Sequence, residues 1–75
     1  MEALTARQVA VLAFVRAHSK AHGYPPTRVE IAHHFKFKSA NGAHEHLQAL
    51  ERKGYLILIA GTSRGIRFPT TAVAA

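Results

Sequence analysis

Two adjacent prolines, Pro25 and Pro26, divide the first half of this 75-residue chain into two segments. Proline disfavours helical backbone at the residue before it and brings no amide hydrogen to a helix interior. Gly23, just upstream, suits the left-handed conformation in which many helices end. One helix must therefore stop near residues 21–22, and the next can begin only after the prolines.

Each of these segments opens with a capping-box sequence, in which a threonine is followed three residues later by Gln or Glu. The boxes lie at residues 5–8 and 27–30. In such a box the threonine hydroxyl accepts a hydrogen bond from the later residue's amide, and the later side chain reaches back to the threonine amide. Apolar residues with helical spacing follow both boxes. The sequence therefore predicts a long first helix and a short second helix that ends near Phe35.

Residues 39–53 are predicted to form a third helix whose two faces differ in character. At about 100° per residue, Ala43, Leu47 and Leu50 stack on one side. The opposite side carries Asn41, Glu45, Gln48 and Arg52, with His44 near its edge. Packing needs the apolar stripe but not the polar row, and these polar side chains match base edges in the major groove. We interpret the segment as a DNA recognition helix, although on this helix alone a solvated face would be the commoner explanation.

Only residues 36–38 separate the second and third predicted helices, and two helices joined by so short a turn describe a helix-turn-helix. Phe37 in this turn is expected to fill the core. Lys36 stands where such turns favour glycine, so some strain or an altered turn is expected. Gly54 is predicted to end the third helix.

The remaining sequence predicts a hairpin, with strands at residues 55–59 and 66–68 around a turn at residues 60–65. The predicted fold class is therefore mainly α with a small β-hairpin: a winged helix-turn-helix of three helices and a two-stranded antiparallel wing. We expect residues 1–68 to form this one domain and residues 69–75 to be a loose C-terminal tail.

The charge balance narrows the choice of partner. Lys and Arg number 10 against 4 Asp and Glu, a formal charge of +6 that favours phosphate or an anionic membrane. The chain has no cysteine, which excludes disulfides and thiolate zinc sites. No apolar run approaches the roughly 18 residues of a membrane span, and the N-terminus lacks a signal-peptide core. We therefore expect a cytoplasmic protein that does not bind a membrane.

Short motifs follow one another in a fixed order between Ala3 and Phe68. They are Leu-Thr-Ala-Arg-Gln at 4–8, Pro-Pro-Thr-Arg at 25–28, Glu-Ile-Ala at 30–32, Phe-Lys-Ser at 37–39, Glu-His-Leu at 45–47, Arg-Lys-Gly at 52–54 and Ser-Arg-Gly-Ile-Arg at 63–67. In this order and spacing the sequence resembles the N-terminal DNA-binding domain of the LexA repressor family. The resemblance implies a winged helix-turn-helix that represses DNA-damage (SOS) genes by binding palindromic operators in double-stranded DNA as a dimer.

The resemblance also implies which residues touch DNA. Base contacts fall to Ser39, Asn41, Gly42, His44 and Glu45. Gly42 stands where the family usually has Ala, and His44 where an acid is common, so the operator preference is expected to differ there. Apart from the resemblance, backbone contacts are predicted for Arg7, Arg28, Gln48, Arg52, Lys53, Ser63, Arg64 and Arg67. For any single cation among them, an ordinary surface charge explains the residue equally well. Of these, Arg64 at the hairpin tip is the best candidate for a minor-groove or backbone contact.

Enzymatic and metal-dependent functions have little support. The serines lack a companion Asp/His motif, and no glycine-rich phosphate loop occurs. His18 and His22 are one helical turn apart, but zinc usually takes three or four ligands, so neither a metal nor a cofactor is expected. The self-cleaving C-terminal domain of the family has no counterpart here, which suggests a DNA-binding domain cut from a longer repressor rather than a naturally short relative.

Two further expectations concern assembly and alternatives. The full-length protein would be a homodimer and this fragment a monomer, located in the bacterial cytoplasm and on the nucleoid through its DNA. The rival function is a protein-interaction module, because winged helices also serve as docking domains and fold alone does not decide. A docking module should show an exposed apolar patch, whereas the polar row and basic charge favour DNA.

Overall fold

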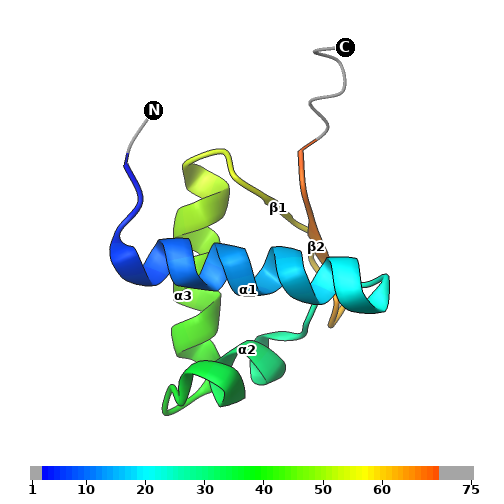
Figure 1. The fold of residues 1–75 in the computed structure, drawn as a ribbon, viewed down its shortest axis with the longest axis horizontal. Helices are drawn as coiled ribbons and strands as arrows, with labels where there is room; N and C mark the ends of the chain where they lie inside the picture. Colours follow the sequence, from blue (N-terminus) through cyan, green and yellow to red (C-terminus); the bar gives the residue numbers. More distant parts are fainter. Residues whose placement is uncertain (1–2, 70–75) are drawn as a thin grey trace.

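The computed structural model describes residues 3–69, which contain three helices followed by a two-stranded antiparallel sheet (Figure 1). The elements are α1 (Ala6–His22), α2 (Arg28–Phe35), α3 (Ala40–Arg52), β1 (Ile57–Leu58) and β2 (Ile66–Arg67). This order and topology confirm the predicted fold class. Most of the predicted tail, residues 70–75, lies outside the described residues.

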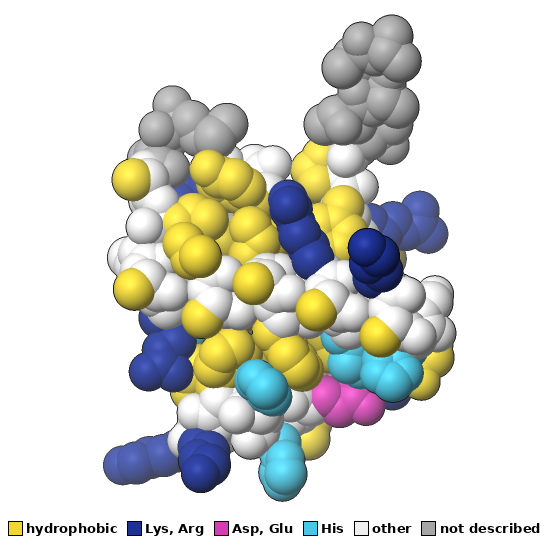
Figure 2. All heavy atoms as spheres, viewed as in Figure 1, with side chains coloured by type: hydrophobic (Ala, Val, Ile, Leu, Met, Phe, Trp, Pro, Cys, Tyr) yellow, Lys and Arg dark blue, Asp and Glu magenta, His cyan; other side chains and the backbone are white. Residues whose placement is uncertain are grey.

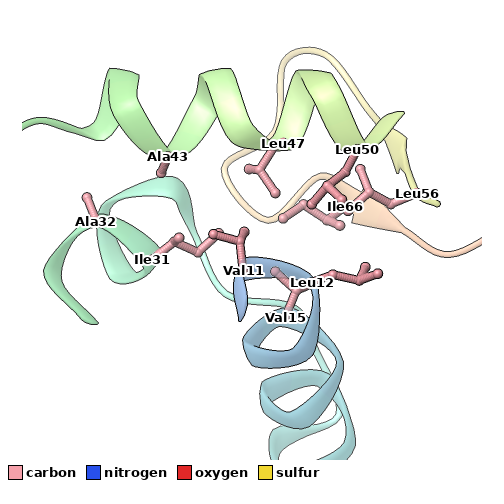
Figure 3. Packing of buried hydrophobic residues seen from close by; sticks show 10 residues of the cluster. All are labelled: Val11, Leu12, Val15, Ile31, Ala32, Ala43, Leu47, Leu50, Leu56 and Ile66. Carbon is pink, nitrogen blue, oxygen red and sulfur yellow. The ribbon is translucent and has the colours of Figure 1, made fainter. Parts of the chain in front are cut away.

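α3 is the central element, because it packs against α1, α2 and β1. In Figure 1, α1 lies across α3, while α2 lies near the beginning of α3 and the hairpin beside its later turns. The core lies where these elements meet (Figure 3). Its fully buried side chains include Val11, Val15, Ile31, Leu47, Leu50 and Leu56. None of the helices in residues 3–69 combines the length and apolar character needed to cross a membrane.

Both predicted capping boxes are present. The Gln8 amide donates to Oγ1 of Thr5 at 3.1 Å, and the Thr5 amide donates to Oε1 of Gln8 at 3.1 Å. In the second box the Glu30 amide donates to Oγ1 of Thr27 at 3.0 Å, and the Thr27 amide donates to Oε1 of Glu30 at 2.8 Å. α1 ends at His22, and Gly23 follows with φ 82°. These helix boundaries are confirmed because they depend on bonds between near neighbours in the sequence.

α2 and α3 end in the same way, with two bonds that turn the chain back on the helix. After α3, the Gly54 amide bonds the Glu51 carbonyl and the Tyr55 amide bonds the Leu50 carbonyl, both at 2.9 Å. This is a Schellman motif, which needs a left-handed residue, and Gly54 supplies it with φ 87°. The prediction that Gly54 ends the helix is confirmed.

The first strand is shorter than predicted. Residues 55–59 were expected to pair, but β1 contains only residues 57–58. The Tyr55 amide completes the Schellman motif, and Leu56 is buried in the core. The second strand is likewise limited to residues 66–67. Tyr55 and Leu56 therefore serve the end of α3 and the core, although an alternating pattern would assign them to the sheet.

Lys36 holds the left-handed position of the second Schellman motif, which closes α2. Its φ is 59°, its amide bonds the His33 carbonyl, and the amide of Phe37 bonds the Ala32 carbonyl. Phe37 consequently packs against the core, as predicted. A side chain in this backbone region is strained, because its Cβ approaches the following carbonyl group.

We expect Lys36→Gly to stabilise the domain by about 1 kcal/mol, since glycine adopts this conformation without strain. For a domain of this size the melting temperature should rise by about 4–8 °C per kcal/mol, measured by circular dichroism. Lys38→Gly is the matched control, because Lys38 does not have positive φ. It should lower the melting temperature through the greater freedom of the unfolded chain. If the melting temperature falls equally in both variants, the backbone at Lys36 is not strained.

Candidate nucleic-acid interface

A groove of about 610 Å³ lies between α3 and the hairpin. Its α3 wall contains His44, Leu47, Gln48 and Glu51, its hairpin wall contains residues 58–63 and Gly65, and Arg28 at the start of α2 completes it. Four predicted DNA contacts therefore line one groove: Arg28, His44, Gln48 and Ser63. They come from three elements that the helix-turn-helix and the wing bring together.

Asn41 and Glu45 lie one turn apart on the exposed surface of α3. Nδ2 of Asn41 donates a hydrogen bond to Oε2 of Glu45 at 3.3 Å. The pair therefore presents an amide and a carboxylate side by side near the N-terminus of α3. Ser39 holds the N-cap position but makes no side-chain capping bond, so its hydroxyl is not used to start the helix.

Gly42 faces the turn of the helix-turn-helix. A Cβ atom built at this position would lie 3.6 Å from Cβ and Cγ of Phe37, which is ordinary contact. An alanine would therefore fit here without displacing its neighbour. Glycine costs about 0.5–1 kcal/mol of stability in a helix interior relative to alanine. Gly42 therefore weakens α3, although the space around it would admit an alanine.

The predicted backbone contacts divide into exposed and tethered side chains. Arg52 and Arg67 are exposed, and Arg7 is exposed with its guanidinium carbon 5.5 Å from the centre of the Phe37 ring. Lys53 is half-buried, and its Nζ donates to Oε1 of Gln8 at 2.8 Å. Lys53 therefore ties the end of α3 to the start of α1, a role that sequence reasoning missed.

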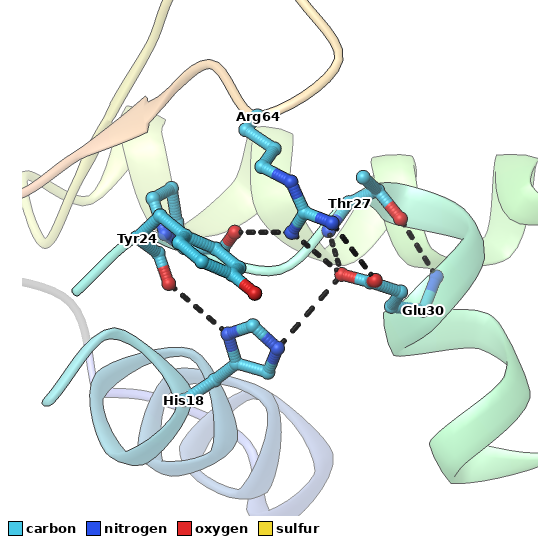
Figure 4. A network of polar contacts seen from close by, with 6 residues as sticks. His18, Tyr24, Thr27, Glu30 and Arg64 are labelled. Atoms are coloured by element: carbon cyan, nitrogen blue, oxygen red, sulfur yellow. Dashed lines mark hydrogen bonds and ion pairs between the residues drawn. The ribbon is translucent and has the colours of Figure 1, made fainter. Parts of the chain in front are cut away.

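Arg64, the best candidate for a minor-groove or backbone contact, already has a partner within the domain. Its guanidinium folds back onto α2 and makes two hydrogen bonds to the carboxylate of Glu30 (Figure 4). This ion pair holds the pKa of Glu30 at about 2, below its ordinary value of 4.5, with the Thr27 amide as the next contributor. The same pair raises the pKa of Arg64. Because the two residues are 34 positions apart, no local pattern indicates the contact.

Glu51 makes another contact that sequence reasoning missed. Its Oε2 accepts a hydrogen bond from the Leu58 amide at 2.9 Å, which joins the last turn of α3 to β1. Glu51 and Leu58 both line the groove. The bond therefore helps to hold the two walls together, and the only available signal would have been a carboxylate late in a helix that precedes a strand.

His18 and His46 lie against aromatic rings. His18 stands 5.9 Å from Phe14 and 5.7 Å from Tyr24 between ring centres, and His46 stacks on Phe37 at 5.4 Å. His18 and His22 are 4.3 Å apart between ring centres. Within residues 3–69, however, no group of three or more His, Asp or Glu is arranged to hold a metal ion.

The face that carries α1 differs from the groove side. Figure 2 shows Lys and Arg side chains both on this face and at its edges, and histidines gathered where α1 meets α2, next to an acidic side chain. A second groove of about 640 Å³ involves α1 and the segment after β2, with Ser19, Tyr55 and Phe68 among its lining residues. It contains none of the predicted DNA contacts.

Comparison with known proteins gives one consistent family. A family model described as the LexA DNA binding domain matches residues 1–65. The chain is 59% identical to a LexA repressor of Glaesserella parasuis over 64 residues and 61% identical to one of Teredinibacter turnerae over 66 residues. These alignments cover 85% and 88% of this chain but 31% and 33% of the relatives. A LexA repressor of Pseudomonas aeruginosa is 52% identical over 92% of this chain and 34% of its own length.

The chain thus spans about a third of the length of the curated relatives that it matches. The matched region includes all three helices and most of the hairpin, so it covers both walls of the groove. The order of elements is that of a winged helix, in agreement with this match. The chain therefore belongs to the LexA DNA-binding domain family.

Proposed function

We propose that this domain binds double-stranded DNA sequence-specifically, as the operator-binding domain of a LexA-like transcriptional repressor. The observation that carries the proposal is the groove between α3 and the hairpin, together with the pair of Asn41 and Glu45 on the exposed face of α3. A major groove admits an α-helix, so α3 would enter it while the hairpin lies against the neighbouring strand.

The base contacts are assigned to the first turns of α3. The amide of Asn41 can read an adenine edge, and the carboxylate of Glu45 can accept from a cytosine amino group. The Ser39 hydroxyl stands at the tip of the helix, and Gly42 is assigned a base contact by its place in the first turn of α3. His44, which lines the groove, offers a ring nitrogen as donor or acceptor.

The backbone contacts are assigned to cationic and polar side chains around this helix. They are Arg7, Arg28, Gln48, Arg52, Lys53, Ser63 and Arg67. Contacts to phosphate fix the register and orientation of a protein on the duplex but carry no sequence information directly. The formal charge of +6 supports this assignment.

The remaining features of the proposal concern the whole repressor. It would bind a palindromic operator as a homodimer and repress DNA-damage genes in the bacterial cytoplasm, with self-cleavage carried out by another domain. The isolated domain would act as a monomer on a half-site. Its affinity should be low and strongly salt-dependent, because each phosphate contact contributes through counterion release.

The alternative is a protein-interaction module. Five large hydrophobic side chains are exposed among residues 3–69, and they lie on α1, α2, the connection between them and the hairpin: Val9, Tyr24, Val29, Ile57 and Ile59. Their distribution over several elements favours the DNA proposal, because a docking site requires one contiguous patch.

The proposal is tested by titrating the domain against labelled palindromic operator and a scrambled duplex at two salt concentrations. We expect tighter binding to the operator at both concentrations and weaker binding to both duplexes at the higher one. Equal affinity for the two duplexes would contradict sequence-specific recognition. Absence of binding at low salt would contradict DNA binding and leave the docking function.

We expect Asn41→Ala to reduce discrimination between operator and scrambled duplex by about 1–3 kcal/mol, the contribution of a good base contact. The melting temperature should change little, because the side chain is exposed. His33→Ala, also exposed but on α2, is the control and should retain full discrimination. If Asn41→Ala discriminates as well as the parent, Asn41 is not a base contact.

A further inference from the structure

Arg64 is held by residues that lie far earlier in the chain. Its Nη1 donates to Oε1 of Glu30 and to the carbonyl oxygen of Pro25, both at 2.8 Å, and its Nη2 donates to Oε2 of Glu30 at 3.0 Å. The guanidinium carbon also lies 4.5 Å from the centre of the Tyr24 ring. A bidentate pair fixes direction as well as distance, so these contacts fix the position of the hairpin at Arg64.

The carboxylate of Glu30 is itself oriented by two helices. Its Oε1 accepts from the Thr27 amide in the capping box, at 2.8 Å. Nε2 of His18, on α1, lies 3.8 Å from the same oxygen, and Nδ1 of His18 lies 3.1 Å from the Tyr24 carbonyl oxygen. Because a carbonyl oxygen only accepts, Nδ1 is the donor in this bond, and Nε2 attracts the carboxylate when it is protonated as well. Figure 4 shows His18 and Arg64 reaching the carboxylate from different elements.

The hairpin needs such an anchor because it is too small to be rigid alone. Its ladder has two residue pairs, Ile57 with Arg67 and Leu58 with Ile66. An isolated two-stranded hairpin is marginally stable at best. The bond from the Leu58 amide to Glu51 holds β1 to α3. The bonds from Arg64 to Glu30 hold the segment just before β2 to α2. These bonds therefore attach the hairpin to both helices of the helix-turn-helix.

The anchor lies directly beside the proposed DNA groove. Ser63 and Gly65, the neighbours of Arg64 in sequence, both line the groove opposite His44 and Gln48 of α3. Since α2 packs against α3, tethering Arg64 to α2 fixes the hairpin wall relative to α3. Release of the tether would let this wall move.

We infer that Glu30 and Arg64 are positioning residues, whose pairing sets the separation between the hairpin and α3 that duplex DNA must fit. The inference rests on the proposed function, and it gives Arg64 a role through Glu30 rather than through a phosphate. The two roles differ at Glu30. Loss of its negative charge would strengthen binding to DNA if Arg64 contacted phosphate, but it weakens binding if the pair positions the hairpin.

The test compares Glu30→Gln, Arg64→Gln and the double variant with the parent. Glutamine also serves in a capping box, so Glu30→Gln retains the start of α2. We expect each single variant to bind operator at least about fivefold more weakly, and the double variant to bind no more weakly than either single one. Lys20→Gln, on the last turn of α1 and outside the groove, controls for the loss of one charge and should change little.

A second readout needs no DNA. The Ile59 amide donates to the Gly65 carbonyl at 2.7 Å across the hairpin. Its hydrogen exchange should accelerate in Glu30→Gln and Arg64→Gln but not in Lys20→Gln, because loss of the tether frees the hairpin to open.

The dependence on pH provides a third readout. Glu30 faces Arg64 from the hairpin, His18 from α1 and the Thr27 amide, and its pKa of about 2 lies below the ordinary 4.5. A lowered carboxyl pKa stabilises the folded state above the unfolded value and loses that stabilisation as pH falls through the folded value. The melting-temperature difference between parent and Glu30→Gln should therefore persist above pH 4.5 and vanish as pH falls through about 2.

Two results would overturn the inference. One is unchanged Ile59 exchange in both single variants. The other is tighter operator binding by Glu30→Gln together with a salt dependence in Arg64→Gln that is smaller by about 0.9 in slope, which marks a direct phosphate contact. If the parent fails to distinguish operator from scrambled duplex, the proposed function fails instead, and the exchange of Ile59 still decides whether the tether holds the hairpin.

Discussion

Leu50→Ala should remove about 2–5 kcal/mol from the free energy of unfolding, as expected for a fully buried leucine. Leu50 has no exposed surface and lies on α3, the helix that packs against the other two and β1. A domain of 75 residues has about 4–11 kcal/mol of stability in total. The loss is therefore a large fraction of the total, and the urea concentration at the midpoint of unfolding, followed by circular dichroism, should fall markedly.

Val29→Ala is the control for this loss, because Val29 is 66% exposed on α2 and should change stability by no more than about 0.5 kcal/mol. Leu50 faces the core, so its removal should reduce operator affinity only through the smaller folded fraction. Excess operator should accordingly restore folding by mass action. Similar losses in the two variants would show that α3 is not the centre of the core.

Gly65→Ala should weaken both the hairpin and operator binding. A Cβ at this position would clash with the Ile59 carbonyl oxygen and lie 3.1 Å from the Thr62 carbonyl oxygen. Backbone atoms cannot move aside as the end of a side chain can. The free energy of unfolding should therefore fall by about 3 kcal/mol, the upper end of the usual cost of overpacking. Because Gly65 also lines the groove, the hairpin wall should be displaced and operator affinity should fall.

Gly42→Ala makes the same chemical change with the opposite expected sign. Its Cβ would make ordinary contact with Phe37 at 3.6 Å, and alanine should gain about 0.5–1 kcal/mol in the helix. Melting temperature and operator affinity should be measured for both variants. A Gly65→Ala protein with parental values of both quantities would contradict the close approach at the hairpin.

The features that the sequence predicts well depend on near neighbours. Both capping boxes, the end of α1 at Gly23 and the end of α3 at Gly54 follow from bonds that span only a few residues. The lengths of the strands do not, because the Tyr55 amide is taken by the end of α3. Local propensity cannot show that a backbone group already has a partner elsewhere.

The proposed site divides in the same way. The helical period places Asn41 and Glu45 on one exposed face, and the structure brings them within 3.3 Å of each other. Arg64 and Lys53 could not be placed by such reasoning. Their partners, Glu30 and Gln8, are 34 and 45 positions away, and a cation in a sequence gives no sign of which distant acceptor it meets.

Those two distant acceptors have something in common, since each is the last residue of a capping box. Oε1 of Gln8 accepts from the Thr5 amide and from Nζ of Lys53, and Oε1 of Glu30 accepts from the Thr27 amide and from Nη1 of Arg64. The side-chain oxygen that caps the start of each of these helices thus also binds a cation from the C-terminal half of the chain. Fraying of either helix start would loosen a long-range contact, so α1 and α2 should melt together with α3 and the hairpin in one cooperative transition.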